Sequence, residues 1–170
     1  MPSIERLDVT VAWTENTDGL DANGGWQITN NGRRVRFNVE DSGAGYCANV
    51  NPNIQSGTAE GIFTVNQDAQ LTASVSGLGE PVEKGFEIME VFVNEILIAQ
   101  GQNDEIDIDP GCDVVVTPEC CESVPIVQTI LSTVDLVAGT TYQLKITFTT
   151  TDATFHVGAF YQTDLAFIPL

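Results

Sequence analysis

Carboxylate side chains are concentrated in one short segment, at a spacing that could bind a metal ion. Five acids fall within ten positions: Asp104, Glu105, Asp107, Asp109 and Asp113. If residues 104–109 are extended, Glu105, Asp107 and Asp109 share one face, because successive side chains of a strand alternate. Oxygen ligands at this density suit Ca²⁺, which would also relieve the repulsion between the carboxylates. The segment therefore predicts a Ca²⁺ site, with a solvated acidic strand face as the alternative.

A second group of oxygen ligands lies near the start of the chain. The stretch ENTDGLDANGG, residues 15–25, carries Asn16, Asp18, Asp21 and Asn23. This composition is typical of a Ca²⁺ loop, with Asp18 and Asp21 as the charged ligands. The stretch lacks the terminal Glu of the EF-hand pattern. A turn that uses Asp, Asn and Gly for local hydrogen bonds is the alternative. We expect no cofactor, unless one of these two acidic stretches binds Ca²⁺.

Four cysteines could form disulfides, and three pairings are open to them. Cys112, Cys120 and Cys121 are close in sequence, whereas Cys47 is distant. We expect one bridge from Cys112 to Cys120 or Cys121, and a second that joins the remaining cysteine to Cys47. A zinc site is the alternative, although the C-x₇-C-C spacing lacks the usual C-x₂₋₄-C pair. Disulfides need an oxidising compartment, yet no signal peptide is visible in MPSIERLDVTV. A particle that is made in a host cytoplasm and then released would meet both conditions.

Catalytic groups are scarce in this chain. The single histidine, His156, falls inside an expected strand, where a structural hydrogen bond is its usual role. No G-x-S-x-G motif and no His/Cys metal spacing occurs. We therefore expect a protein that is not an enzyme.

Basic residues form one cluster in an otherwise acidic protein. The net charge is −18, from 24 acids and six basic residues, which argues against nucleic acid as a partner. Twelve acids lie between Glu80 and Glu122. Three of the four arginines are Arg33, Arg34 and Arg36. This segregation predicts an interface in which the arginines meet the acidic segment of the same chain or of a neighbouring copy. Charges that protect an exposed edge strand are the alternative.

The central stretch, residues 61–100, must provide the framework for these side chains. Leu71, Ala73 and Val75 alternate with polar residues, the period of a strand with one buried face. The apolar run 86–98 is interrupted by Asn94-Glu95, which predicts two strands joined by a hairpin. A helix over 86–98 is the alternative. We expect three strands in this stretch, with a break at SGLGEP.

The rest of the chain repeats the same pattern of short strands and turns. Expected strands lie in LDVTVAW, in a hairpin around Asn30-Asn31-Gly32, in IVQTILSTVDL, and in two C-terminal runs around residues 142–148 and 155–161. Long loops are expected at 41–60 and 100–125. No apolar run is long enough for a membrane helix. These features predict one all-β domain over residues 1–170, an antiparallel β-sandwich of jelly-roll-like form.

Residues 60–170 carry a resemblance to a known class of domain. The order of features is SGLGE, GFEIMEVFVNEILIAQG, a cysteine-bearing loop and LVAGTTYQLKITFTTTDATFHVGAFYQTDLAFIPL. It resembles a β-sandwich domain of structural proteins of tailed bacteriophages, and is similar to lectin-like jelly rolls. The resemblance implies a capsid decoration, fibre or tail-appendage protein located in the virion. Its partners would be copies of itself, with a trimer as the expected form, and other virion proteins.

A carbohydrate-binding module, using Ca²⁺ in one version, is the alternative function. Such a module would bind a glycan by stacking sugar rings on exposed Trp or Tyr side chains. The chain offers only Trp13, Trp26, Tyr46, Tyr142 and Tyr161. Several of these alternate with expected core positions, which favours the structural role.

Overall fold

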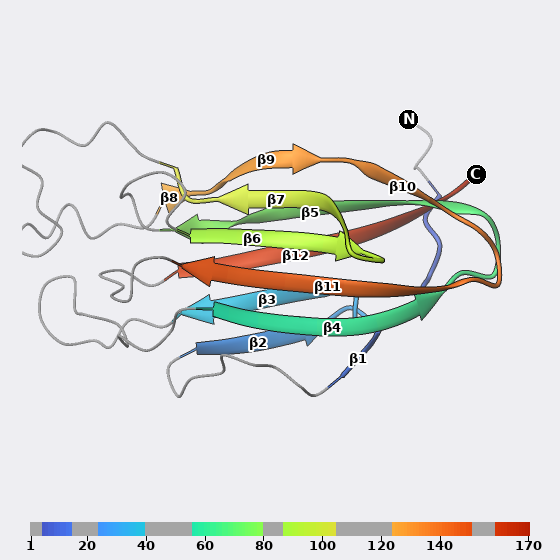
Figure 1. Ribbon diagram of the computed structural model, residues 1–170, viewed down its shortest axis with the longest axis horizontal. Helices are drawn as coiled ribbons and strands as arrows, with labels where there is room; N and C mark the ends of the chain where they lie inside the picture. The colour runs from blue at the N-terminus through green and yellow to red at the C-terminus, as the bar shows by residue number, and fades with distance from the viewer. Residues whose placement is uncertain (1–4, 15–23, 40–55, 80–86, 105–123, 151–158) are drawn as a thin grey trace, which may run out of the picture.

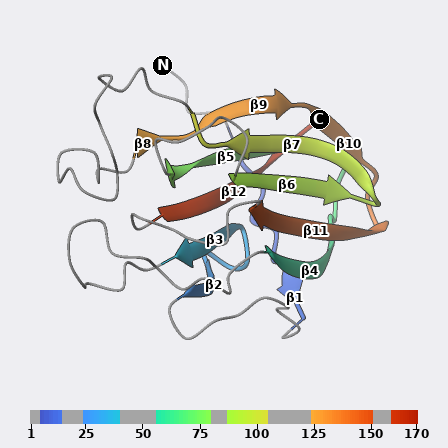
Figure 2. The ribbon, with the colours of Figure 1, turned by 60° about the vertical axis from the view of Figure 1, so that its left-hand side comes forward.

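The computed structural model describes residues 5–14, 24–39, 56–79, 87–104, 124–150 and 159–170, which form twelve β-strands and no helix (Figure 1). The strands make two antiparallel sheets that pack face to face (Figure 2). The predicted antiparallel β-sandwich is therefore confirmed.

Six strands form the first sheet, which we call sheet A. In spatial order they are β1 (Ala12–Trp13), β4 (Ser56–Thr64), β11 (Thr141–Thr150), β6 (Glu87–Val93), β7 (Ile96–Gln102) and β9 (Val127–Leu131). The second sheet, which we call sheet B, contains five strands in a row and one short additional strand. Their order is β10 (Thr133–Leu136), β5 (Ala69–Gly79), β12 (Ala159–Pro169), β3 (Arg34–Val39) and β2 (Gly24–Thr29), and β8 (Val124–Pro125) pairs with β5.

Two predicted hairpins are present, and each turns on residues with positive φ. Asn30, Asn31 and Gly32 join β2 to β3 with φ of 57°, 55° and 82°. Asn94 and Glu95 join β6 to β7 with φ of 46° and 68°, the sign that a two-residue type I′ turn requires. The alternative of a helix over 86–98 is wrong.

Strand β5 is longer than the sequence predicts. It runs without interruption from Ala69 to Gly79, so the expected break in SGLGEP does not begin at Ser76. Gly77 allows this continuation because its φ is +148° and a Cβ there would lie 2.0 Å from the carbonyl oxygen of Phe160 on β12. Only a glycine fits so close to the neighbouring strand. Residues 61–100 contribute to four strands rather than three, because β4 extends to Thr64 and precedes β5, β6 and β7.

Other strand boundaries differ from the prediction because pairing with neighbouring strands determines where each strand begins and ends. IVQTILSTVDL is not one strand, because β9 pairs with β7 in sheet A whereas β10 pairs with β5 in sheet B, and the chain crosses between the sheets at Ser132. The expected loop 41–60 ends early, since β4 begins at Ser56. The expected loop 100–125 is shortened by β7 and β8. In LDVTVAW only Ala12–Trp13 form a strand.

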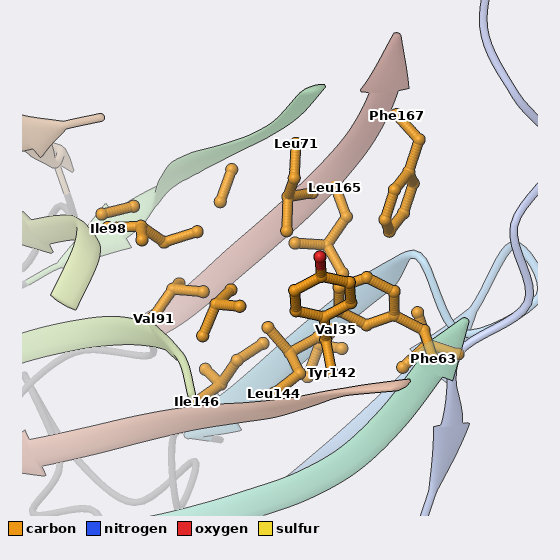
Figure 3. Close-up of a cluster of buried hydrophobic side chains, with 14 of the residues drawn as sticks. Val35, Phe63, Leu71, Val91, Ile98, Tyr142, Leu144, Ile146, Leu165 and Phe167 are labelled. Atoms are coloured by element: carbon orange, nitrogen blue, oxygen red, sulfur yellow. The ribbon is translucent and has the colours of Figure 1, made fainter. Parts of the chain in front are cut away.

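The core lies between the two sheets and is filled by the alternate residues of their strands (Figure 3). Two aromatic groups span the gap between the sheets, one at each end. Phe37 and Phe148 stack with ring centroids 4.6 Å apart, and Tyr161 adjoins Phe148 at 5.0 Å. Phe63 contacts both Tyr142 and Phe167 at the opposite end. Burial and aromatic packing therefore tie each sheet to the other along its length.

The connections of the chain are unequal at the two ends of the sandwich. Strands β3, β5, β7 and β11 finish, and β4, β6, β8 and β12 begin, at the same end (left in Figure 1). The long intervals 40–55, 80–86, 103–123 and 151–158 therefore all start and finish there. Turns of four residues or fewer, such as the β10–β11 turn that contains Gly139, lie towards the other end.

Candidate functional site

The most organised polar feature of the described surface lies on the outer face of sheet B. Val35 and Phe37 are fully buried, so the alternating Arg34 and Arg36 of β3 point to the opposite, outer face. Across the β3–β12 ladder, Asp164 is the register partner of Arg34 and Gln162 is the partner of Arg36. We call these four residues the arginine ladder.

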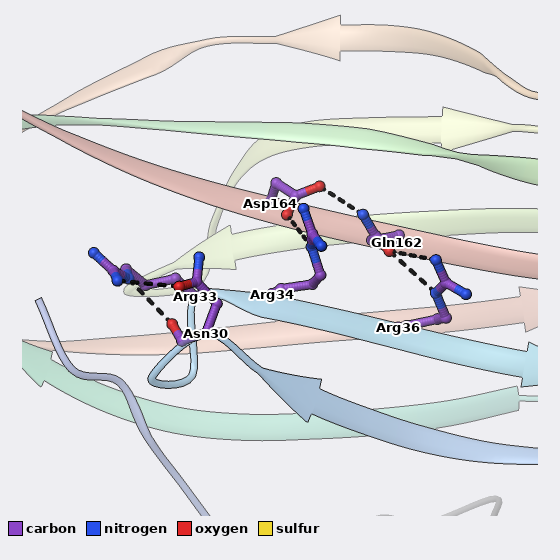
Figure 4. Close-up of polar contacts among 6 residues, drawn as sticks. All are labelled: Asn30, Arg33, Arg34, Arg36, Gln162 and Asp164. Carbon is purple, nitrogen blue, oxygen red and sulfur yellow. Dashed lines mark hydrogen bonds and ion pairs between the residues drawn. The ribbon is translucent and has the colours of Figure 1, made fainter. Parts of the chain in front are cut away.

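Hydrogen bonds connect all four members of the arginine ladder (Figure 4). Arg34 Nε donates to Asp164 Oδ1 at 2.7 Å. Arg36 donates to Gln162 Oε1 through Nε at 3.0 Å and through Nη2 at 2.8 Å. Gln162 Nε2 then donates to Asp164 Oδ2 at 2.8 Å, which connects the Arg36–Gln162 pair to the Arg34–Asp164 pair. Gln162 is only 8% exposed; it anchors Arg36 directly and Arg34 through Asp164.

An aromatic ring further restrains one of the arginines. The guanidinium of Arg36 lies 4.2 Å from the ring centroid of Phe160, the outward residue that precedes Gln162 by two positions on β12. A guanidinium stacked on a ring gains a cation–π attraction and loses rotational freedom. Both arginines are therefore held in place before any partner arrives.

Part of each guanidinium remains available for a ligand. Within the described residues, Arg34 donates only through Nε, and its side chain is 49% exposed. Arg36 likewise leaves Nη1 without a hydrogen bond to any described residue. The paired terminal nitrogens of a guanidinium match the two oxygens of a carboxylate. The arrangement can therefore bind an acidic side chain.

Arg33 lies apart from the ladder and supports the β2–β3 turn. Its Nε donates to the Asn30 carbonyl at 3.1 Å, and its Nη2 lies 3.1 Å from Asp8 Oδ1. Nη1 also donates to the carbonyl of Leu7 at 3.4 Å. With its side chain only 17% exposed, Arg33 links the turn to the N-terminal segment. Of the three arginines predicted at an interface, only Arg34 and Arg36 share an exposed face.

Most of the other predicted site residues lie outside the described residues. This applies to Glu105, Asp107, Asp109 and Asp113, to Asp18 and Asp21, to Cys47, Cys112, Cys120 and Cys121, and to His156. Asp104 is described and half-buried, two residues beyond the end of β7. The described part of the chain contains no group of three or more His, Cys, Asp or Glu side chains that could hold a metal ion. The Ca²⁺ and disulfide hypotheses stay predictions.

The aromatic residues considered for sugar stacking are mostly part of the core. Tyr161 is fully buried and Tyr142 is 8% exposed. Trp13 and Trp26 are half-buried and pack against the core cluster, while Tyr46 lies outside the described residues. The described surface therefore presents no exposed Trp or Tyr for a sugar ring.

Sequence reasoning missed half of the arginine ladder. Asp164 and Gln162 lie 130 and 126 positions from the arginines that they bind. The alternation of polar residues in FYQTDL could have shown only that these two side chains share one face of a strand. Which strand lies beside it is a property of the fold and is not encoded locally.

Comparisons with known proteins add little. Neither a protein family nor a curated protein matches the sequence. Among solved structures, the crystal structure of dimeric latent PorU from Porphyromonas gingivalis is similar with a TM-score of 0.39 and 11% identity. The match covers 99% of this chain and 14% of the PorU chain. A likeness at that level carries no argument about function. No helix in the described part of the chain is long and apolar enough to cross a membrane.

Proposed function

We propose that this protein is a non-catalytic structural module that associates through the arginine ladder with an acidic surface of a second copy. The observation that carries the proposal is the fixed, half-exposed pair of arginines on one sheet face of a chain whose net charge is −18. The resemblance of residues 60–170 suggests the setting, which is a phage particle with this protein as a decoration, fibre or tail-appendage component. Other virion proteins would then be further partners.

The energetics of the ladder favour a role in binding over a role in folding. An exposed ion pair such as Arg34–Asp164 contributes only about 0–1 kcal/mol to stability, because water and salt screen it. A carboxylate that arrives with a protein partner excludes water from the guanidinium, and the same charge then contributes more to specificity and association rate. Since Gln162 and Phe160 already restrain Arg36, little side-chain entropy is lost on binding.

The long connections of the chain support a surface-binding role. The parts of the two predicted long loops that remain between strands, residues 41–55 and 103–123, connect strands that finish and begin at one end of the sandwich. Loops that a rigid scaffold holds are where binding proteins usually carry recognition. The lack of an exposed Trp or Tyr among the described residues argues against the carbohydrate-binding alternative.

Light scattering after size-exclusion chromatography tests the proposal, at about 0.15 M salt, where repulsion between distant exposed charges is largely screened. We expect the wild-type protein to be oligomeric at tens of micromolar, and Arg34→Glu to shift it towards the monomer. Arg6→Glu is the matched control, because Arg6 is exposed and the charge change is the same. It should leave the oligomer intact. A wild-type protein that stays strictly monomeric, above all one that binds a defined glycan on an array, would overturn the proposal.

A further inference from the structure

A groove on the outer face of sheet A has no assigned role. It encloses about 210 Å³, and its lining includes Glu60, Ile62, Glu95, Gln143 and Lys145. Glu60 and Ile62 are outward residues of β4, and Glu95 lies on the β6–β7 hairpin. The groove is therefore on the opposite side of the sandwich from the arginine ladder.

The charge in the groove is not neutralised by its own lysine. Lys145 is the cross-strand partner of Glu60, yet its Nζ lies over the Phe92 ring, 4.8 Å from the centroid. Within the described residues neither Glu60 nor Glu95 forms an ion pair, and both are exposed. The groove thus presents two carboxylates, in the same way that the ladder presents two guanidinium groups.

The lining and size of the groove suit side chains better than a small molecule. Ile62 is one of the lining residues and is 50% exposed, so the aliphatic stem of a long side chain could cover it. Pockets that bind drug-sized ligands usually enclose about 300–1,000 Å³, so this groove is smaller than a typical small-molecule site. Arg34 and Arg36 are two positions apart on a strand, about 6–7 Å, so both can reach one groove.

We propose that this groove of one copy receives Arg34 and Arg36 of the next, so that sheet A of one molecule packs on sheet B of its neighbour. The inference rests on the proposed function and identifies the acidic surface that the ladder meets. Carboxylates over an exposed isoleucine are complementary in charge and polarity to guanidinium groups on aliphatic stems. Because the two surfaces differ, the contact is heterologous, and repeated copies form either a closed ring or a filament.

Charge reversal of each surface tests the contact in a way that separates it from the proposed function. One variant carries Arg34→Glu and Arg36→Glu, and the other carries Glu60→Lys and Glu95→Lys. We expect each variant to be monomeric alone and a one-to-one mixture to regain association in light scattering, since each retains the surface that the other needs. The control Glu5→Lys/Asp68→Lys makes the same change of charge at two exposed residues outside the strands of both sheets, and it should associate as the wild type does.

The possible failures of this experiment have different meanings. If the arginine variant is monomeric while the Glu60/Glu95 variant associates like the wild type, the groove is not the partner and the proposed function stands. If both folded variants are monomeric but their mixture does not associate, the head-to-tail contact is wrong. If the wild type itself is monomeric, both proposals fail. Circular dichroism of every variant confirms that loss of association is not loss of folding.

Discussion

The side chain of Gln128 reaches from sheet A to β5 of sheet B, where it takes the place of a missing neighbouring strand, and its removal should destabilise the fold. Gln128 lies on β9 in sheet A, but its Nε2 donates to the Ala73 carbonyl of β5 at 3.1 Å and its Oε1 accepts from Val75 N at 3.3 Å. These backbone groups fall between the residues of β5 that pair with β10 and those that pair with β8. The amide therefore supplies the donor and the acceptor that a continuous neighbour of β5 would supply.

The structure sets the size of the expected effect of Gln128→Leu. Leucine has a similar length but leaves the carbonyl of Ala73 and the N–H of Val75 without their partners. An unsatisfied buried backbone group costs about 1–3 kcal/mol. Gln128 is half-buried and the bond from Val75 is long, so water can replace part of the loss. We expect the free energy of unfolding to fall by about 2 kcal/mol.

Urea denaturation followed by circular dichroism would measure this change. Gln27→Leu is the matched control, because Gln27 is exposed on β2 and its side chain forms no hydrogen bond with a described residue. Its effect should stay within about 0.5 kcal/mol. Equal midpoints and slopes for the two variants would show that Gln128 does not stabilise the edge of β5.

Three further predictions concern other parts of the core. Gly77→Ala should lower the free energy of unfolding by about 3 kcal/mol or more in urea, because its Cβ would clash with the β12 backbone. Trp26→Phe should destabilise the protein less than Trp13→Phe does in thermal unfolding, since the indole N–H of Trp26 is buried without a partner whereas that of Trp13 donates to a carbonyl at 2.8 Å. Tyr161→Phe should cost about 1–3 kcal/mol in chemical denaturation, because the hydroxyl donates to the buried Glu87 carboxyl at 2.6 Å; a midpoint equal to that of the wild type would contradict this.

The strands that were predicted correctly share a clear physical signal. Along β11, Tyr142, Leu144, Ile146 and Phe148 are buried, and the residues between them face outward. One face of this strand contacts the core and the other contacts solvent, so polarity alternates with period two. The Asn-Asn-Gly and Asn-Glu turns were recognisable because these residue types favour a hairpin tip.

The errors occurred where neighbours, rather than local polarity, determine the structure. β4 contains SGTAE, whose small and polar residues predict a loop, yet it lies inside sheet A between β1 and β11. The chain changes sheets at Ser132 because β9 pairs with β7 and β10 pairs with β5, and the pattern of IVQTILSTVDL contains no sign of this. Pairing partners are chosen by the whole fold.

The rigidity of the sandwich bears on what the proposed contact would build. The arginine ladder lies on the outer face of sheet B and the groove on the outer face of sheet A. Packed sheets of this kind lie about 10 Å apart. The stacked rings of Phe37 and Phe148 and the bond from Tyr161 to Glu87 join these sheets through the core, so the two surfaces cannot turn independently. A heterologous contact between rigid copies repeats one rotation and one translation at every step. The wild-type assembly should therefore show a single repeating geometry in electron micrographs, as a ring of fixed number or a regular filament, and particles of irregular shape would argue for a different contact.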